Sequence, residues 1–148
     1  MKTIRKILVA VDFSEYAESV LDVAVEFAGN FNAELHLVHA FDVRIPLVTP
    51  YEVAIPTAFI EEAREAAASK LGALIRKVAA EGVQATSHLS EVPAASAIVD
   101  LAEELGVDLI IMGTRGHTGL KHVLLGSVAE RTLRHAPCSV LTVKESHE

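Results

Sequence analysis

Asp108-Leu109-Ile110-Ile111-Met112-Gly113-Thr114-Arg115-Gly116 sets the architecture of this chain, and Gly126-Ser127 follows it after nine further residues. The apolar run before Gly113 is typical of a strand buried on both faces of a parallel sheet. Residues Val128–Arg134 have the pattern of a short helix. Glycines between a strand and a helix let backbone N–H groups approach an anion closely, and the helix dipole favours negative charge there. The stretch therefore predicts a phosphate cradle, with Ser127 offering a hydroxyl and an amide. The alternative is that the glycines serve only tight turns.

The composition bounds the class of protein. The 148 residues fit one domain spanning 1–148, which is long enough to bury a substantial core. Hydrophobic residues make up 51% of the chain, yet no run reaches the roughly 18 apolar residues that a membrane helix needs. The run Ile7–Val11 after the basic N-terminus is only five residues long, so it predicts a first strand rather than a signal peptide. The single cysteine, Cys138, excludes an intramolecular disulfide and fits a reducing cytosol, so we expect a cytoplasmic protein with no membrane contact.

The charge is unevenly distributed along the chain. A net charge of −7 argues against nucleic acid as a partner, because phosphate contacts supply most of that affinity. Residues 113–135 carry a balance of +3, against −10 for the rest of the chain. A local basic region in an acidic protein suits a small polyanion. Arg131 and Arg134 in this region have the alternative role of a solvated helix face.

Predicted strands and helices alternate along the whole chain. Apolar side chains recur at helical spacing on one face of each predicted helix, and glycine or proline residues mark several ends. The predicted strands are Lys6–Val11, Ala33–Ala40, Val83–Leu89, Asp108–Met112 and Cys138–Val143. The predicted helices run from a cap at Ser14 to Gly29-Asn30, over Thr57–Glu81, from Pro93 to Leu105 and over Val128–Arg134. This alternation predicts a single α/β domain with an open parallel sheet and helices on both faces. The more polar third strand is expected near a sheet edge.

Asp12 ends the first predicted strand. Ligands of open α/β sheets bind beyond the carboxyl ends of the strands, where the strand order reverses. If the first and fourth strands are neighbours, Asp12 faces the glycine loop across one crevice. Asp12 would then bind ribose hydroxyls or a phosphate-bound Mg²⁺. The alternative role is to cap the first helix beside Ser14.

Residues Asp42–Pro56 have no hydrophobic period and contain Pro46, Pro50 and Pro56. Loops of this length in a compact domain are usually functional or mobile. The segment is therefore interpreted as a lid or a partner surface, or else as a variable connection.

The chain closely resembles the universal stress protein family, in its ATP-binding branch. The family's nucleotide motif is Gly, two residues, Gly, nine residues, Gly and then Ser or Thr, and Gly113, Gly116, Gly126 and Ser127 match it completely. The resemblance covers nearly the whole chain and includes Lys6–Ser14, Leu37–Ala40, Asp108–Gly116, Leu125–Ala129 and Pro137–Val143.

The resemblance implies a Rossmann-like sheet with strand order 3-2-1-4-5 and a site for ATP, with Mg²⁺. The turn after the first strand would meet the adenosine, with Asp12 near the ribose, and the backbone at Ala40 would lie beside the adenine. Other residues would line the nucleoside or cradle the phosphates. The implied nucleotide-binding residues are Ala10, Val11, Asp12, Ala40, Met112, Gly113, Arg115, Gly116, Gly126, Ser127 and Val128. Ala10 stands where some members carry proline, and Ala40 where many carry valine, but both contacts depend chiefly on backbone.

Other chemistry fits the sequence less well. There is no Walker lysine motif, no G-x-G-x-x-G after the first strand and no G-x-S-x-G elbow. No residue is an obvious general base, so bound ATP should hydrolyse slowly at most. We therefore expect no catalytic residues and a regulatory module of the stress response rather than an efficient enzyme, acting on an unidentified client protein.

Two rival functions remain. One is a protein-interaction and dimerisation module with a vestigial nucleotide site. The other is a receiver-like phosphoacceptor domain, which needs an aspartate at the end of the third strand. The sequence there is His88-Leu89-Ser90-Glu91, which disfavours that function.

Seven histidines raise the question of a metal site. His36 and His39 are three apart on a strand and so point to opposite faces. His117 and His122 have no nearby carboxylate in the sequence, although His117 would be able to touch a phosphate. We expect surface or loop histidines and no metal held by the protein alone.

The last predicted strand, Cys138–Val143, suggests how the chain assembles. In the implied order it lies at a sheet edge, and it carries no charge to deter pairing. Antiparallel pairing with its own copy would give a closed, two-fold interface. The resemblance implies the same homodimer, while cover by the N-terminal residues or a helix is the alternative.

Overall fold

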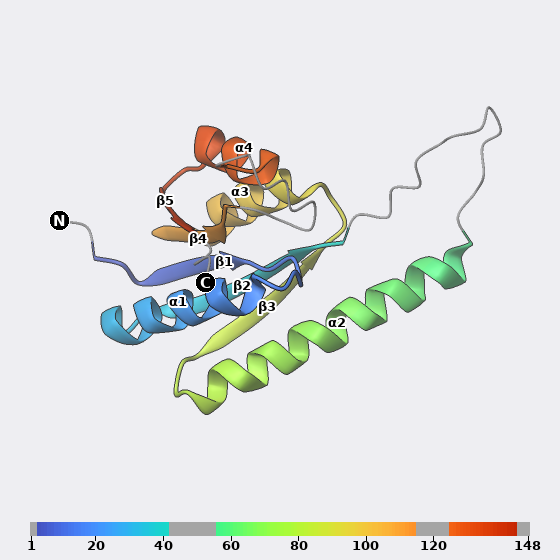
Figure 1. Ribbon diagram of the computed structural model, residues 1–148, viewed down its shortest axis with the longest axis horizontal. Coiled ribbons are helices and arrows are strands. Elements are labelled where there is room, and N and C mark those ends of the chain that lie inside the picture. The colour runs from blue at the N-terminus through green and yellow to red at the C-terminus, as the bar shows by residue number, and fades with distance from the viewer. Residues whose placement is uncertain (1–2, 42–55, 115–124, 145–148) are drawn as a thin grey trace.

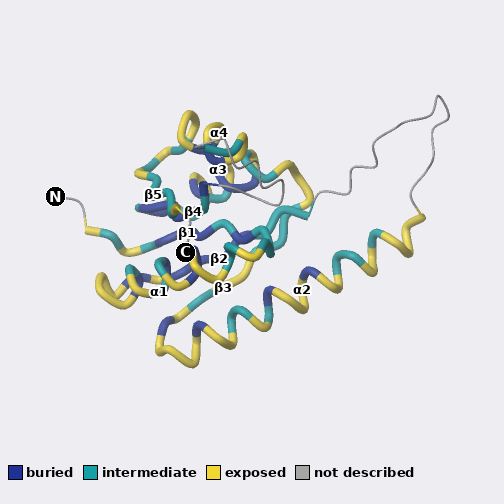
Figure 2. Tube along the Cα trace, viewed as in Figure 1, coloured by how far each residue is buried: buried dark blue, intermediate teal, exposed yellow. Residues whose placement is uncertain are grey.

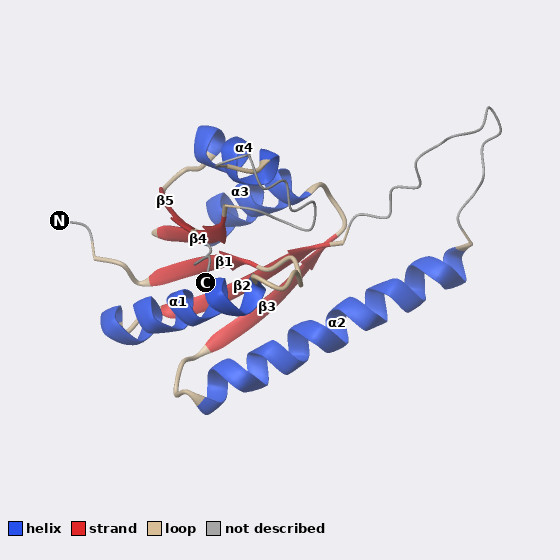
Figure 3. Cartoon of the chain, viewed as in Figure 1, coloured by secondary structure: helices blue, strands red, loops and turns tan. Residues whose placement is uncertain are grey.

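The computed structural model describes residues 3–41, 56–114 and 125–144 (Figure 1). Within them, five parallel strands form one sheet in the order β3-β2-β1-β4-β5, which confirms the predicted fold and strand order (Figure 3). The strands are β1 Lys6–Ala10, β2 Glu34–Ala40, β3 Ala85–Ser90, β4 Leu109–Gly113 and β5 Ser139–Val143. The helices are α1 Ala17–Phe31, α2 Thr57–Ala80, α3 Ala94–Leu105 and α4 Ser127–His135. None of these helices is long and apolar enough to cross a membrane.

The core lies on both faces of the sheet. Alternate side chains of a strand point to opposite faces, so Ile7 and Val9 join one apolar cluster and Leu8 joins the other. Helices α1 and α2 cover the first face, and α3 and α4 cover the second (Figure 1). β1 from Ile7 to Ala10 and β4 from Leu109 to Gly113 are accordingly apolar, because both of their faces are covered. Figure 2 shows the buried residues concentrated in the middle of the sheet and the helix surfaces turned to solvent.

The first helix differs from the sequence prediction at both ends. It begins at Ala17 rather than at a Ser14 cap, because the Asp12 carboxylate accepts the Ser14 N–H and Ser14 O accepts the Ala17 N–H, which makes a turn before the helix. It also runs through Gly29-Asn30 to Phe31 and ends at Asn32, whose φ of 53° is left-handed. Asparagine adopts that conformation more readily than most other residues with a side chain, so it can end a helix as glycine does.

The remaining helix boundaries agree with the sequence analysis within one residue. Pro93 precedes α3, and Gly106 ends it at a left-handed φ of 63°. Gly82 follows α2 at a φ of 80°. The third strand lies at a sheet edge, as its polar sequence predicts.

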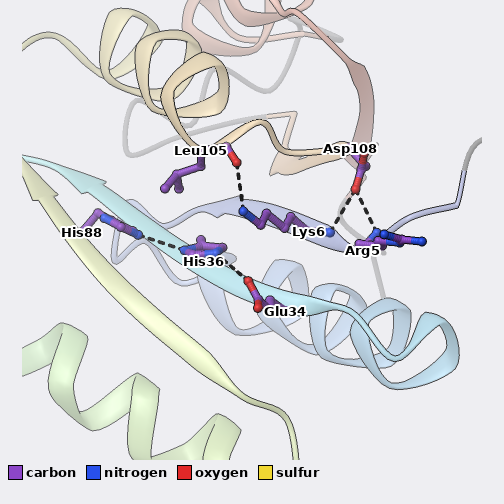
Figure 4. A network of polar contacts seen from close by, with 7 residues as sticks. All are labelled: Arg5, Lys6, Glu34, His36, His88, Leu105 and Asp108. Atoms are coloured by element: carbon purple, nitrogen blue, oxygen red, sulfur yellow. Dashed lines mark hydrogen bonds and ion pairs between the residues drawn. The ribbon is translucent and has the colours of Figure 1, made fainter.

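The strand order reverses between β1 and β4. β1 pairs with β2 on one side and with β4 on the other, in the register Ile7↔Leu109. At the amino ends of these two strands, the Asp108 carboxylate accepts the N–H groups of Arg5 and Lys6 at 2.9 and 3.1 Å (Figure 4). These bonds close the gap between β1 and β4 at their amino ends. A crevice between the two strands therefore lies at their carboxyl ends.

Candidate functional site

A cavity of about 350 Å³ lies at the carboxyl ends of β1, β2 and β4. The first turns of α1, α3 and α4 close its other sides. Its position is the point where the strand order reverses, which is where open α/β sheets bind ligands.

Nine of the eleven sequence-predicted site residues line this one cavity. They are Ala10, Val11, Asp12, Ala40, Met112, Gly113, Gly126, Ser127 and Val128. Arg115 and Gly116 lie outside the described residues, as do His117, His122 and the Asp42–Pro56 segment up to residue 55. The structure therefore brings together residues from the two ends of the sequence, over a separation of more than a hundred positions.

One wall of the cavity is the turn that follows β1. The Val11 N–H donates to Val38 O at 2.9 Å, so the backbone continues the β1–β2 pairing one residue beyond the strand. The Ser14 N–H then donates to Asp12 Oδ1 at 2.9 Å. This is an Asx turn, in which an aspartate side chain replaces a backbone carbonyl. Asp12 thus shapes the turn and also lines the cavity.

The opposite wall joins β4 to α4. The Gly126 N–H donates to Thr114 O at 2.6 Å, and the Thr114 N–H donates to Val143 O at 3.2 Å. Gly126 is the N-cap of α4 with an extended backbone, and no side chain among the described residues caps this helix. The first N–H groups of an uncapped helix are available to an anion, which the helix dipole also attracts. Ser127 and Val128 provide two of these groups at the cavity.

The floor of the cavity is apolar. Val38, Ile98 and Met112 are almost completely buried and line it from β2, α3 and β4. An apolar floor beside a row of backbone N–H groups suits a ligand with a flat ring at one end and an anionic group at the other.

Several residues that line the cavity are not among the predicted site residues. Ala17, Val20, Ala94 and Ile98 carry the generic apolar spacing of helices, which does not distinguish a core residue from a ligand contact. His39 and Thr114 each stand directly beside a predicted site residue in the sequence, and that adjacency is the only signal that would have found them.

One expectation about the histidines is wrong. His36 is buried, with 9% of its surface exposed, rather than lying at the surface or in a loop. Its Nδ1 lies 3.0 Å from His88 Nε2, and its Nε2 lies 3.6 Å from Glu34 Oε2, beyond hydrogen-bonding distance (Figure 4). Burial lowers the pKa of His88 below 6.5, His36 lowers it further, and Glu104 opposes the shift. Among the described residues, no group of three His, Cys, Asp or Glu side chains is placed to hold a metal ion.

Comparison with known proteins places the chain in a family. Residues 3–144 match the Universal stress protein family. A universal stress protein of Methanocaldococcus jannaschii is 36% identical over 146 residues, which cover 95% of this chain and 82% of that protein.

Solved structures agree with that assignment. The structure of the hypothetical protein MJ0577 superposes with a TM-score of 0.85 at 32% identity, covering 99% of this chain and 100% of that one. The universal stress protein from Archaeoglobus fulgidus in complex with dAMP gives a TM-score of 0.67 at 27% identity, covering 97% of this chain and 100% of that one. The family match over nearly the whole sequence, with the fold and the crevice described above, means that this chain belongs to the universal stress protein family.

Proposed function

We propose that the chain binds ATP, with Mg²⁺, in the cavity at the carboxyl ends of β1, β2 and β4 and acts as a regulatory module of the stress response. The observation that carries this proposal is the convergence of nine predicted nucleotide-binding residues on one cavity. The relative from Archaeoglobus fulgidus, which was solved in complex with dAMP, supports a nucleotide as the class of ligand.

Each part of the cavity suits one part of the nucleotide. The apolar floor around Met112 and Val38 accommodates a base, with the backbone at Ala40 beside it. Asp12, on the turn after β1, is placed for the ribose hydroxyls or for Mg²⁺. The backbone at Ser127 and Val128, at the start of α4, provides N–H groups for phosphate. Arg115 and Gly116 complete the cradle in this proposal on the sequence motif alone.

Hydrolysis of the bound ATP is proposed to be slow. Among the described residues that line the cavity, Asp12 is the one carboxylate, and its Oδ1 already accepts the Ser14 N–H. Phosphoryl transfer depends on a positioned nucleophile as well as on charge stabilisation. The protein would then report nucleotide occupancy to a client protein rather than turn ATP over.

A second candidate function is protein interaction with a vestigial nucleotide site. The observation behind it is the edge position of β5, whose outer side offers backbone N–H and C=O groups to another strand. The two functions are compatible, because the β5 edge and the cavity involve different surfaces. We propose a homodimer through this strand together with nucleotide binding.

The test of ATP binding begins with protein that has been unfolded, freed of nucleotide and refolded. Calorimetric titration with Mg-ATP should give a saturable signal, and mass spectrometry of material released from the native preparation should identify the nucleotide carried through purification. A refolded protein that gives no heat with millimolar Mg-ATP, and a native preparation that releases no nucleotide, would leave the interaction module as the function.

A further inference from the structure

His39, at the end of β2, makes a short hydrogen bond to the turn that follows β1. Its Nδ1 lies 2.7 Å from the carbonyl oxygen of Val11. A carbonyl oxygen can only accept, so Nδ1 must carry the proton and donate it. A second hydrogen bond also holds Val11 to β2, because the Val11 N–H donates to Val38 O at 2.9 Å.

The ring of His39 also contacts Phe13. The two ring centroids are 4.2 Å apart with an interplanar angle of 38°. Phe13 has a φ of 58°, a left-handed conformation that is unfavourable for a bulky side chain and persists only where surrounding contacts hold it. Lys70 of α2 adds a second contact, with its ammonium 5.3 Å from the centre of the Phe13 ring.

These two contacts fall on either side of Asp12. His39 bonds to the backbone of the residue before Asp12 and packs against the side chain of the residue after it. The direction in which Asp12 leaves the backbone is set by the torsions of that short turn. His39 itself lines the cavity beside Asp12.

We propose that His39 is a positioning residue, which fixes the Val11–Phe13 turn and through it the orientation of the Asp12 carboxylate in the cavity. The proposal rests on the proposed function for the identity of the ligand, but its structural part concerns the free protein. His36 provides a matched control, since it lies on the same strand, three residues away, and contacts His88 rather than the turn.

Three single substitutions separate the two contacts of His39 from a general effect on β2. His39→Asn keeps an N–H donor near the position of Nδ1 and removes the ring, whereas His39→Phe keeps a ring and removes the donor. His36→Asn alters β2 at the control position. Each variant is first compared with the parent for thermal unfolding and circular dichroism.

The first measurement uses the protein without ligand. Amide hydrogen exchange by NMR reports the Ser14 N–H, which donates to Asp12 Oδ1. His39→Phe should speed this exchange about fivefold or more, as expected for the loss of one supporting hydrogen bond. The Ser14 exchange rate of His39→Asn should stay closer to that of the parent, and the rate of His36→Asn should equal that of the parent. Equal Ser14 exchange in His39→Phe and the parent would overturn the proposal whether or not a nucleotide binds.

The second measurement is a double-mutant cycle for Mg-ATP affinity. His39→Phe should weaken binding about five- to tenfold in the parent, and less than about twofold when Asp12→Ala is already present, because His39 acts through Asp12. An equal loss in both backgrounds would mean that His39 supports the fold generally, which contradicts the proposal. A parent that binds no Mg-ATP would defeat the proposed function, and the Ser14 exchange would still decide the role of His39.

Discussion

The backbone N–H of Gly126 donates to the carbonyl oxygen of Thr114 at 2.6 Å, and this bond joins the start of α4 to the end of β4. Thr114 is itself buried and donates its N–H to Val143 of β5. The N-terminus of α4 is therefore held against the carboxyl edge of the sheet by hydrogen bonds between backbone groups. This arrangement allows the role of Gly126 in binding to be tested separately from its role in folding.

Gly126→Val should impair nucleotide binding much more than it impairs folding. Gly126 has a φ of −69° and a ψ of 164°, which is extended backbone that valine adopts readily. The added side chain should block the close approach of phosphate to the backbone, so Mg-ATP affinity should fall at least about tenfold, a free-energy change of about 1.4 kcal/mol. Calorimetric titration measures the affinity, and thermal unfolding without ligand measures the fold.

Gly29→Ala in α1 serves as the control for that substitution. A Cβ at Gly29 would meet no atom within 4 Å, and Gly29 is not among the residues lining the cavity. This variant should bind Mg-ATP like the parent. If Gly126→Val did so too, the glycine would have no role in the approach of phosphate.

Mg-ATP should stabilise the native protein against heat. A ligand at a hundred times its dissociation constant contributes about 2.7 kcal/mol to the free energy of unfolding. For a chain of this length the melting temperature should rise by roughly 5–10 °C. Scanning calorimetry on nucleotide-free protein checks the shift, and Asp12→Ala should reduce it. An identical melting temperature with and without millimolar Mg-ATP would argue against the site.

The His36–His88 contact should make stability depend on pH in a defined direction. Burial, followed by the charge of His36, lowers the pKa of His88 in the folded protein below the ordinary value of 6.5. As pH falls below 6.5, the unfolded chain takes up a proton that folded His88 does not, so the free energy of unfolding decreases until the pH reaches the folded pKa. Urea unfolding measured at several pH values should therefore show a slope in this range.

His88→Gln should flatten that slope, because glutamine does not titrate. The slope of the parent, measured under the same conditions, provides the comparison. A slope that survived in His88→Gln would have to be assigned to other groups.

The β5 edge should mediate a homodimer. Leu109↔Ser139 and Met112↔Thr142 are paired across β4 and β5, which leaves the other side of β5 at the margin of the sheet. Ser139→Lys with Thr142→Lys places charges on this strand, and charged edge strands resist pairing with another chain. Sedimentation at micromolar concentration should give a dimer for the parent and a monomer for the double variant. A monomeric parent, with or without Mg-ATP, would exclude this interface.

The fold was predictable because local signals agreed with one another along the chain. Buried parallel strands such as Leu109–Gly113 are short apolar runs in the sequence, and Gly106 indicates the end of α3. The predicted helix cap at Ser14 is wrong because the Ser14 N–H donates to the side chain of Asp12, two positions earlier. This bond makes a turn before the helix, and the sequence pattern of a helix cap does not distinguish such a turn from the helix itself.

The site was only partly predictable, for a related reason. Residues with a distinctive backbone role, such as Gly126, stand out in a sequence, and those with ordinary apolar side chains, such as Ile98, do not. His36 contacts His88, which lies 52 residues further along the chain, and the two residues meet only once β2 and β3 are side by side. No local pattern carries that information.

The central position of β1 determines when, during synthesis, the two walls of the cavity can come together. β1 pairs first with β2, but its second neighbour, β4, is made about a hundred residues later, and the bond from Arg5 to Asp108 spans 103 positions. A nascent chain that has been made only through β3 contains Asp12 but still lacks Gly126 and the start of α4, which form the opposite wall of the cavity. The residues that line the cavity are therefore all present only after the chain has been synthesised as far as Ala129.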